Sequence, residues 1–163
     1  MPEVRLRPGK GTLTNHGKRL ISRSMYQKGK GFIGAAVLLS HHEGHEFVVL
    51  HLLAQGIEIT LKGLLIFKDY DKYRPRLKGA FGHNLEAIAS EACGAFRLNR
   101  ARPPLANQLH RLSTLYAKHL LRYGSFYDVL IDPHTIPSDL ILRRIAAVLR
   151  LADRQLSTSL IGA

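Results

Sequence analysis

Four polar side chains that could bind a ligand or transfer a proton interrupt the most apolar segment of this sequence. Their offsets are 0, 4, 7 and 11, which on an α-helix places all four within about 60° of one another. They are His51, Gln55, Glu58 and Lys62. Glu58 and Lys62 could act as an acid and a base on a substrate. We favour a structural ion pair, because the two form an i, i+4 pair in the attractive order, with His51 and Gln55 satisfying hydrogen bonds in the core.

A histidine stands where another helix is expected to begin. His83 follows Gly82 and precedes Asn84, a residue type that often caps a helix N-terminus. That end of a helix attracts anions such as phosphate, so His83 could hold an anion. A turn-forming role is the interpretation we favour.

Basic residues follow one face of each of two predicted helices, 104–122 and 138–156, at offsets 0, 7 and 11. Few acids lie near them, whereas ordinary protein surfaces mix both signs of charge. Such faces could track a phosphate backbone, or they could simply be solvated. The six positions are Arg111, Lys118, Arg122, Arg143, Arg150 and Arg154.

Histidines and glutamates crowd the segment 41–46. His41 and His45 could chelate a metal ion if both lay on one helix, but Gly44 favours a turn between them. No complete ligand set is visible, so the sequence predicts no metal and no cofactor.

The elements that must position these residues are predicted to be helices. Apolar residues from Phe32 onward recur at intervals of three and four residues, as on one face of an α-helix. No sustained alternation of apolar and polar residues marks a strand. The predicted helices are 17–40 with a break at 29–31, then 46–68, 84–96, 104–122 and 138–156. Segment 46–68 is apolar on most of its circumference, which is typical of the central helix of a bundle. The fold class is therefore all-α, with four to five helices.

Length and charge set the wider frame. The chain has 163 residues, enough for one domain. Its net charge of +12 favours polyanionic partners. Residues 1–31 hold eight basic residues and one acid, so we predict a basic N-terminal arm over 1–31 and a helical domain over 32–163.

Cysteine usage and hydropathy indicate the compartment. Cys93 is the only cysteine, so the chain cannot form an internal disulfide, and a reducing, cytoplasmic location fits best. The apolar stretch from Phe47 to Phe67 is long enough for a bilayer. It carries charged residues that are costly in hydrocarbon, so no membrane partner is predicted.

Three stretches of this sequence resemble a known family. They are Leu53-Ala-Gln-Gly-Ile-Glu-Ile-Thr-Leu-Lys-Gly-Leu-Leu65, Gly82-His83-Asn84-Leu85, and Leu115-Tyr116 through Arg122-Tyr123. Together they resemble the HEPN domain (higher eukaryotes and prokaryotes nucleotide-binding domain) over about residues 32–124. The resemblance implies an up-and-down helical bundle and frequently a homodimer. It also implies a metal-independent ribonuclease in many branches, and often a nucleotidyltransferase partner in toxin–antitoxin pairs.

The chain departs from the family pattern at several positions. Asn84 replaces the usual Asp and Gly124 the usual Pro. The nuclease branches carry an Arg and a His with four to six residues between them, near the start of a late helix. Here only Arg76 and His83 have that spacing, and they precede the third long helix instead.

The sequence therefore predicts a HEPN-like module that binds nucleic acid or nucleotide without catalysis. Such a module could form one half of a toxin–antitoxin pair. Two alternatives stay open. One is a metal-independent ribonuclease that uses Arg76 and His83. The other is a protein-interaction subunit of a nucleotidyltransferase partner.

Overall fold

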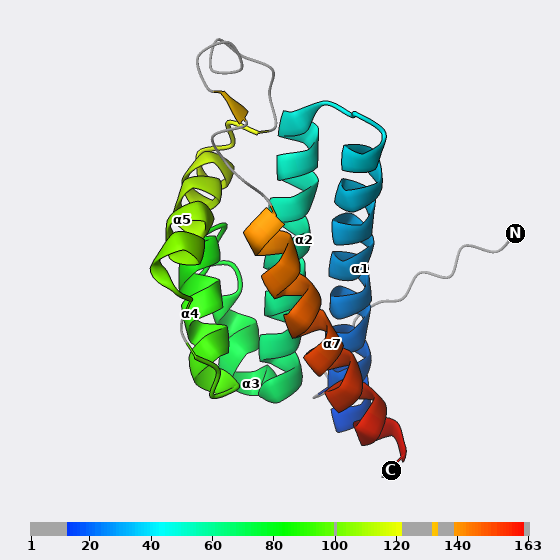
Figure 1. The fold of residues 1–163 in the computed structure, drawn as a ribbon. Helices are drawn as coiled ribbons and strands as arrows, with labels where there is room; N and C mark the ends of the chain where they lie inside the picture. Colours follow the sequence, from blue (N-terminus) through cyan, green and yellow to red (C-terminus); the bar gives the residue numbers. More distant parts are fainter. Residues whose placement is uncertain (1–12, 100, 122–131, 134–138, 162–163) are drawn as a thin grey trace, which may run out of the picture.

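The computed structural model describes residues 13–99, 101–121, 132–133 and 139–161, and within the last range the side chains of 141–150 and 152–153. These residues form helices and turns without a strand (Figure 1). The elements are α1 (Asn15–His41), α2 (Glu46–Lys68), α3 (Tyr70–Tyr73), the 3-10 turn η1 (Arg74–Arg76), α4 (Leu85–Ala95), α5 (Pro103–Ala117) and α7 (Asp139–Ile161). The prediction of an all-α bundle is confirmed.

The bundle is arranged around α2. Figure 1 shows α1 antiparallel beside α2, α4 and α5 on the other side, and α7 crossing in front between α5 and α1. The most buried side chains lie on α1, α2, α4 and α5, among them Tyr26, Leu53, Leu85, Ile88 and Leu112. Helix α2 is long and apolar enough to cross a membrane, yet most of it is buried inside the bundle, as expected for a central core helix.

Two helix predictions match the structure closely. The predicted segment 46–68 is α2, and the predicted segment 84–96 is α4 with one capping residue at each end. Asn84 caps α4 as expected, because its side-chain oxygen accepts the backbone N–H of Ala87 at 3.0 Å. The last helix begins close to the predicted position, at Asp139, and continues to Ile161.

The predicted break at 29–31 is wrong, because α1 runs without interruption from Asn15 to His41. Gly29 is buried where α1 meets α2. A Cβ atom there would lie only 2.6 Å from the backbone nitrogen of Thr60. The glycine therefore permits a close helix contact and does not end the helix. Residues 15–31 of the predicted basic arm accordingly form the first half of α1.

Helix α5 ends earlier than predicted. It stops at Ala117, and His119 just beyond it has a positive φ of 58°. Lys118 therefore does not continue the basic face of Arg111 as a helical residue. Arg122 and Gly124 lie outside the described residues.

Candidate functional site

Four polar side chains from α2, the turn before α4 and α5 meet inside the bundle. They are Glu58, Lys62, His83 and Tyr116, referred to below as the Glu58 cluster. Glu58 Oε1 accepts a hydrogen bond from Lys62 Nζ at 2.6 Å. Glu58 Oε2 accepts one from the Tyr116 hydroxyl at 2.6 Å and lies 3.0 Å from His83 Nδ1. One carboxylate thus joins three segments that are distant in sequence.

Local backbone features bring the histidine to this carboxylate. Gly82 adopts a positive φ of 47°, a conformation that glycine tolerates well. Its carbonyl accepts a hydrogen bond from Lys62 Nζ at 2.6 Å. One turn later, the backbone N–H of Leu85 donates to Ser113 Oγ on α5 at 3.1 Å. The turn before α4 is therefore fixed to both α2 and α5.

The cluster is buried at its centre and open at one end. Glu58, Lys62 and Tyr116 are only 7%, 8% and 2% exposed, whereas the side chain of His83 is 41% exposed. The imidazole of His83 is therefore the part of the cluster that a solvent-borne ligand can reach.

The Glu58 carboxylate stays ionised in this setting. Burial raises the pKa of Glu58, but the hydrogen bonds from Lys62, Tyr116 and His83 outweigh burial and hold the pKa below its ordinary value. An ionised carboxylate only accepts hydrogen bonds. His83 Nδ1 therefore carries a hydrogen and donates a hydrogen bond to Glu58. This leaves His83 Nε2 for a ligand.

A second histidine faces the first. The rings of His83 and His119 lie 5.4 Å apart between centroids and are inclined by 74°. His119 is exposed and follows the end of α5. The two rings are in edge-to-face contact, so a ligand that exchanges protons with both imidazoles would have to bind beside the pair and not between the rings.

The other predicted site residues lie in different surroundings. They are His51 and Gln55 on α2, and Arg76, the expected partner of His83. His51 lies against Tyr116, with 5.8 Å between ring centroids, and Gln55 is half-buried. Arg76 does not join His83. Its guanidinium is 3.1 Å from the Glu91 carboxylate and 4.7 Å from the centroid of the Phe81 ring.

The two metal candidates are separated by a turn. His41 ends α1, and His45 precedes the first residue of α2, so they are not an i, i+4 pair on one helix. In the part of the chain that the structure describes, no group of three or more His, Cys, Asp or Glu side chains is arranged to hold a metal ion.

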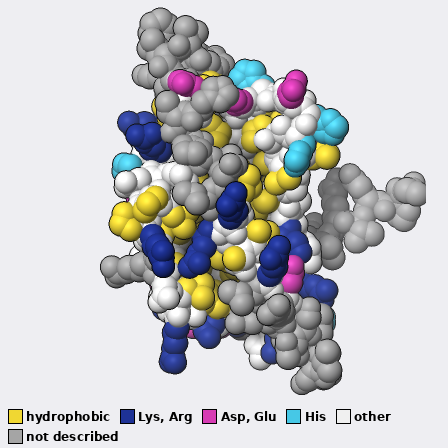
Figure 2. All heavy atoms as spheres, in the orientation of Figure 1, with side chains coloured by type: hydrophobic (Ala, Val, Ile, Leu, Met, Phe, Trp, Pro, Cys, Tyr) yellow, Lys and Arg dark blue, Asp and Glu magenta, His cyan; other side chains and the backbone are white. Residues whose placement is uncertain are grey.

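The predicted phosphate-contacting residues are described only in part. Arg111, Lys118, Arg143 and Arg150 are exposed, and so is Arg144. Arg122 and the side chain of Arg154 lie outside the described residues. Figure 2 shows Lys and Arg gathered over the middle and lower part of the face that carries α7, with most of the visible Asp and Glu at the upper end.

Two members of this site were not predicted from the sequence. They are Tyr116 and His119. A buried tyrosine hydroxyl needs a partner, so Tyr116 carried a signal, but its partner Glu58 is 58 positions away. His119 carried none, because its neighbour His83 is set by tertiary packing.

Comparison of the chain with protein-family models, curated proteins and solved structures gives no match.

Proposed function

We propose that this protein is a HEPN-like helical module that binds single-stranded RNA through the outward face of α7. The observation that carries the proposal is a stripe of exposed residues on that helix, in which Arg143 and Arg150 flank Ala146 and Ala147. The two arginines are separated by about 10 Å along the helix axis. The alanines between them project little, so a sugar–phosphate backbone can approach closely.

The acid nearest this stripe in sequence is already neutralised. Asp153 of α7 pairs with Lys30 at 2.9 Å and accepts a hydrogen bond from the Tyr26 hydroxyl at 3.0 Å. Asp153 therefore does not neutralise the positive charge of Arg143 and Arg150. Guanidinium groups suit phosphate because their planar geometry allows paired hydrogen bonds.

The test is fluorescence anisotropy of a labelled single-stranded RNA titrated with the full chain at several salt concentrations. Each phosphate contact on single-stranded nucleic acid contributes about −0.7 to the slope of log K against log salt. The double variant Arg143→Gln/Arg150→Gln is expected to weaken binding and to make that slope less steep by about 1.4.

A matched control separates a local contact from bulk charge. Arg74→Gln/Lys78→Gln removes two exposed positive charges from the segment before α4. This control is expected to change binding much less than the α7 double variant. Equal weakening in both double variants, or no RNA binding at low salt, would refute the proposal.

The His83–His119 pair favours a second candidate function, the metal-independent cleavage of RNA. In that reaction one imidazole takes the proton of a ribose 2′-hydroxyl as its oxygen attacks the adjacent phosphorus. The other imidazole protonates the departing 5′-oxygen. The products are a 2′,3′-cyclic phosphate end and a 5′-hydroxyl end, and Glu58 holds His83 in place during the transfer.

This candidate is tested with end-labelled RNA in EDTA on a denaturing gel. Cleavage is expected to be lost in both His83→Ala and His119→Ala. It is expected to persist in His110→Ala, which removes an exposed imidazole that lies 3.0 Å from the Glu86 carboxylate. Intact RNA with the unmodified chain would exclude the nuclease and leave the binding module.

A further inference from the structure

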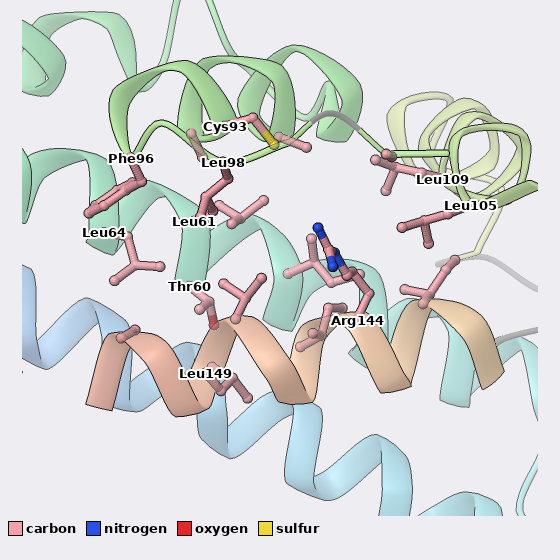
Figure 3. A pocket seen from close by; sticks show the side chains of 18 of the residues that line it. Thr60, Leu61, Leu64, Cys93, Phe96, Leu98, Leu105, Leu109, Arg144 and Leu149 are labelled. Atoms are coloured by element: carbon pink, nitrogen blue, oxygen red, sulfur yellow. The ribbon is translucent and has the colours of Figure 1, made fainter. Parts of the chain in front are cut away.

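An apolar cavity of about 250 Å³ lies between α7 and the helices α2, α4 and α5. Figure 3 shows side chains from these helices gathered around it, including Leu61 and Leu64 of α2, Cys93 of α4, and Leu105 and Leu109 of α5. Its principal lining residues are Leu61, Leu64, Leu105, Leu109, Ile145 and Leu149. Apolar cavities of roughly 150 Å³ stay dry and can take up a small hydrocarbon. The space here therefore suits an apolar group larger than benzene.

One charged side chain enters this apolar space. Arg144 projects from α7 toward the middle of the cavity in Figure 3, and it remains exposed to solvent. Among the described residues it forms no hydrogen bond or ion pair, in contrast to Lys30, Lys62 and Arg76. A guanidinium beside an apolar surface offers paired hydrogen bonds to an anion at the mouth of the cavity.

From this juxtaposition we infer that the cavity binds a medium-chain carboxylate, with its hydrocarbon chain inside and its carboxylate on Arg144. A carboxylate carries one negative charge and matches one guanidinium. A phosphate monoester carries −1.5 to −2 at neutral pH, more than Arg144 alone compensates. The size of the cavity favours a chain of medium length over a long acyl chain.

Cys93 makes occupancy measurable without a label. It lines the cavity, and it is the only cysteine in the chain. A bound chain would cover its sulfur, so the rate at which a thiol reagent modifies Cys93 reports occupancy directly.

The experiment titrates the full chain with sodium octanoate below its micelle-forming range and follows Cys93 modification and calorimetric binding. Octanoate is expected to slow the modification and to bind at least tenfold more tightly than octanol. Arg144→Gln is expected to weaken octanoate binding by about tenfold. The matched control Arg74→Gln, which removes an exposed positive charge outside the cavity lining, is expected to leave it unchanged.

A cavity-filling variant tests the location. Ala89 lines the cavity from α4, so Ala89→Leu is expected to abolish octanoate binding while circular dichroism remains that of a folded helical protein. The proposal is overturned if octanol binds as well as octanoate, if octyl phosphate binds more tightly, if Arg144→Gln behaves like Arg74→Gln, or if octanoate leaves Cys93 modification unchanged.

Discussion

Glu58 occupies an unusual position for a carboxylate, because it is nearly buried and still ionised. Removing such a group from water is costly unless each oxygen finds a donor. Here Lys62 donates to one oxygen, while Tyr116 and His83 donate to the other. Loss of the carboxylate would leave Lys62, only 8% exposed, without its ionised partner. The stability of the cluster therefore depends on this one charge.

We expect Glu58→Gln to lower the free energy of unfolding by about 3 kcal/mol, as when one partner of a buried ion pair is removed. Urea denaturation measures it. The control is Glu86→Gln, which alters a carboxylate that contacts His110 at 3.0 Å with both partners well exposed. Exposed pairs contribute about 0–1 kcal/mol. A loss below about 1 kcal/mol in Glu58→Gln would contradict the expectation.

The same carboxylate predicts a pH dependence of stability. Its pKa in the folded protein lies below the ordinary value of 4.5. A group with a lowered folded pKa stabilises the fold fully above its unfolded pKa and loses that contribution as pH falls through the folded pKa. The difference in unfolding free energy between the unmodified chain and Glu58→Gln is therefore expected to be constant near neutral pH and to shrink below about pH 4.5. A difference that persists undiminished through the acid range would show that the charge is not its source.

At the scale of the elements, α1 and α2 approach closely because glycines on each helix lie against the backbone of the other. Cβ atoms added at Gly56 and Gly63 of α2 would lie 2.9 Å from the backbone nitrogens of Ile33 and Tyr26, respectively. From the other side, Gly29 faces the backbone of Thr60. The added Cβ atoms would also meet the side chains of Thr60 and Ile33, but the backbone atoms within 3.0 Å cannot move aside without shifting a helix.

We expect Gly29→Ala to destabilise the fold by about 2–3 kcal/mol, since overpacking of a close contact outweighs the better helix propensity of alanine. Gly34 in the same helix provides the control, because nothing lies within 4 Å of its added Cβ. Gly34→Ala is expected to stabilise the protein by about 0.5–1 kcal/mol. Thermal unfolding is expected to show a lower melting temperature for Gly29→Ala and a higher one for Gly34→Ala. Equal shifts in melting temperature would refute the close contact.

The sequence predicts elements well where the signal is local. The bounds of helix 46–68 were predicted correctly because its apolar run begins and ends with charged residues. The N-cap role of Asn84 was predicted correctly because a cap depends on the next three residues. Gly29 was misinterpreted because its role is set by Thr60, which lies in another helix. The site divides in the same way: Glu58–Lys62 is one turn apart and was predicted, whereas Tyr116 and His119 join it only through packing.

At the scale of the whole molecule, positive charge exceeds negative charge by a wide margin. The chain has 24 Lys and Arg against 12 Asp and Glu. Several of the acids are already engaged in ion pairs, including Asp71, Glu91 and Asp153. The remaining cations repel one another, and such self-repulsion destabilises a compact state.

Salt is therefore expected to raise the melting temperature of the free protein. Between 0.01 M and 0.15 M salt, the screening length falls from about 30 Å to about 8 Å. A gain of about 1 kcal/mol would raise the melting temperature by about 2–4 °C for a chain of this size. Differential scanning fluorimetry across a salt series measures the shift. A fall in melting temperature would mean that favourable ion pairs outweigh the repulsion.

The short turn 42–45 between α1 and α2 also determines the order in which the molecule can assemble. Contacts between helices that are neighbours in sequence have a small loop-closure cost, so this hairpin can form early. Glu58 gains the Tyr116 hydroxyl only when α5, 58 positions further along, has docked. A chain that has emerged only as far as α2 therefore holds its glycine-lined hairpin with Glu58 paired to Lys62 alone. We therefore expect the histidine site to be completed only after α5 has docked, whereas the α1–α2 hairpin can form before it.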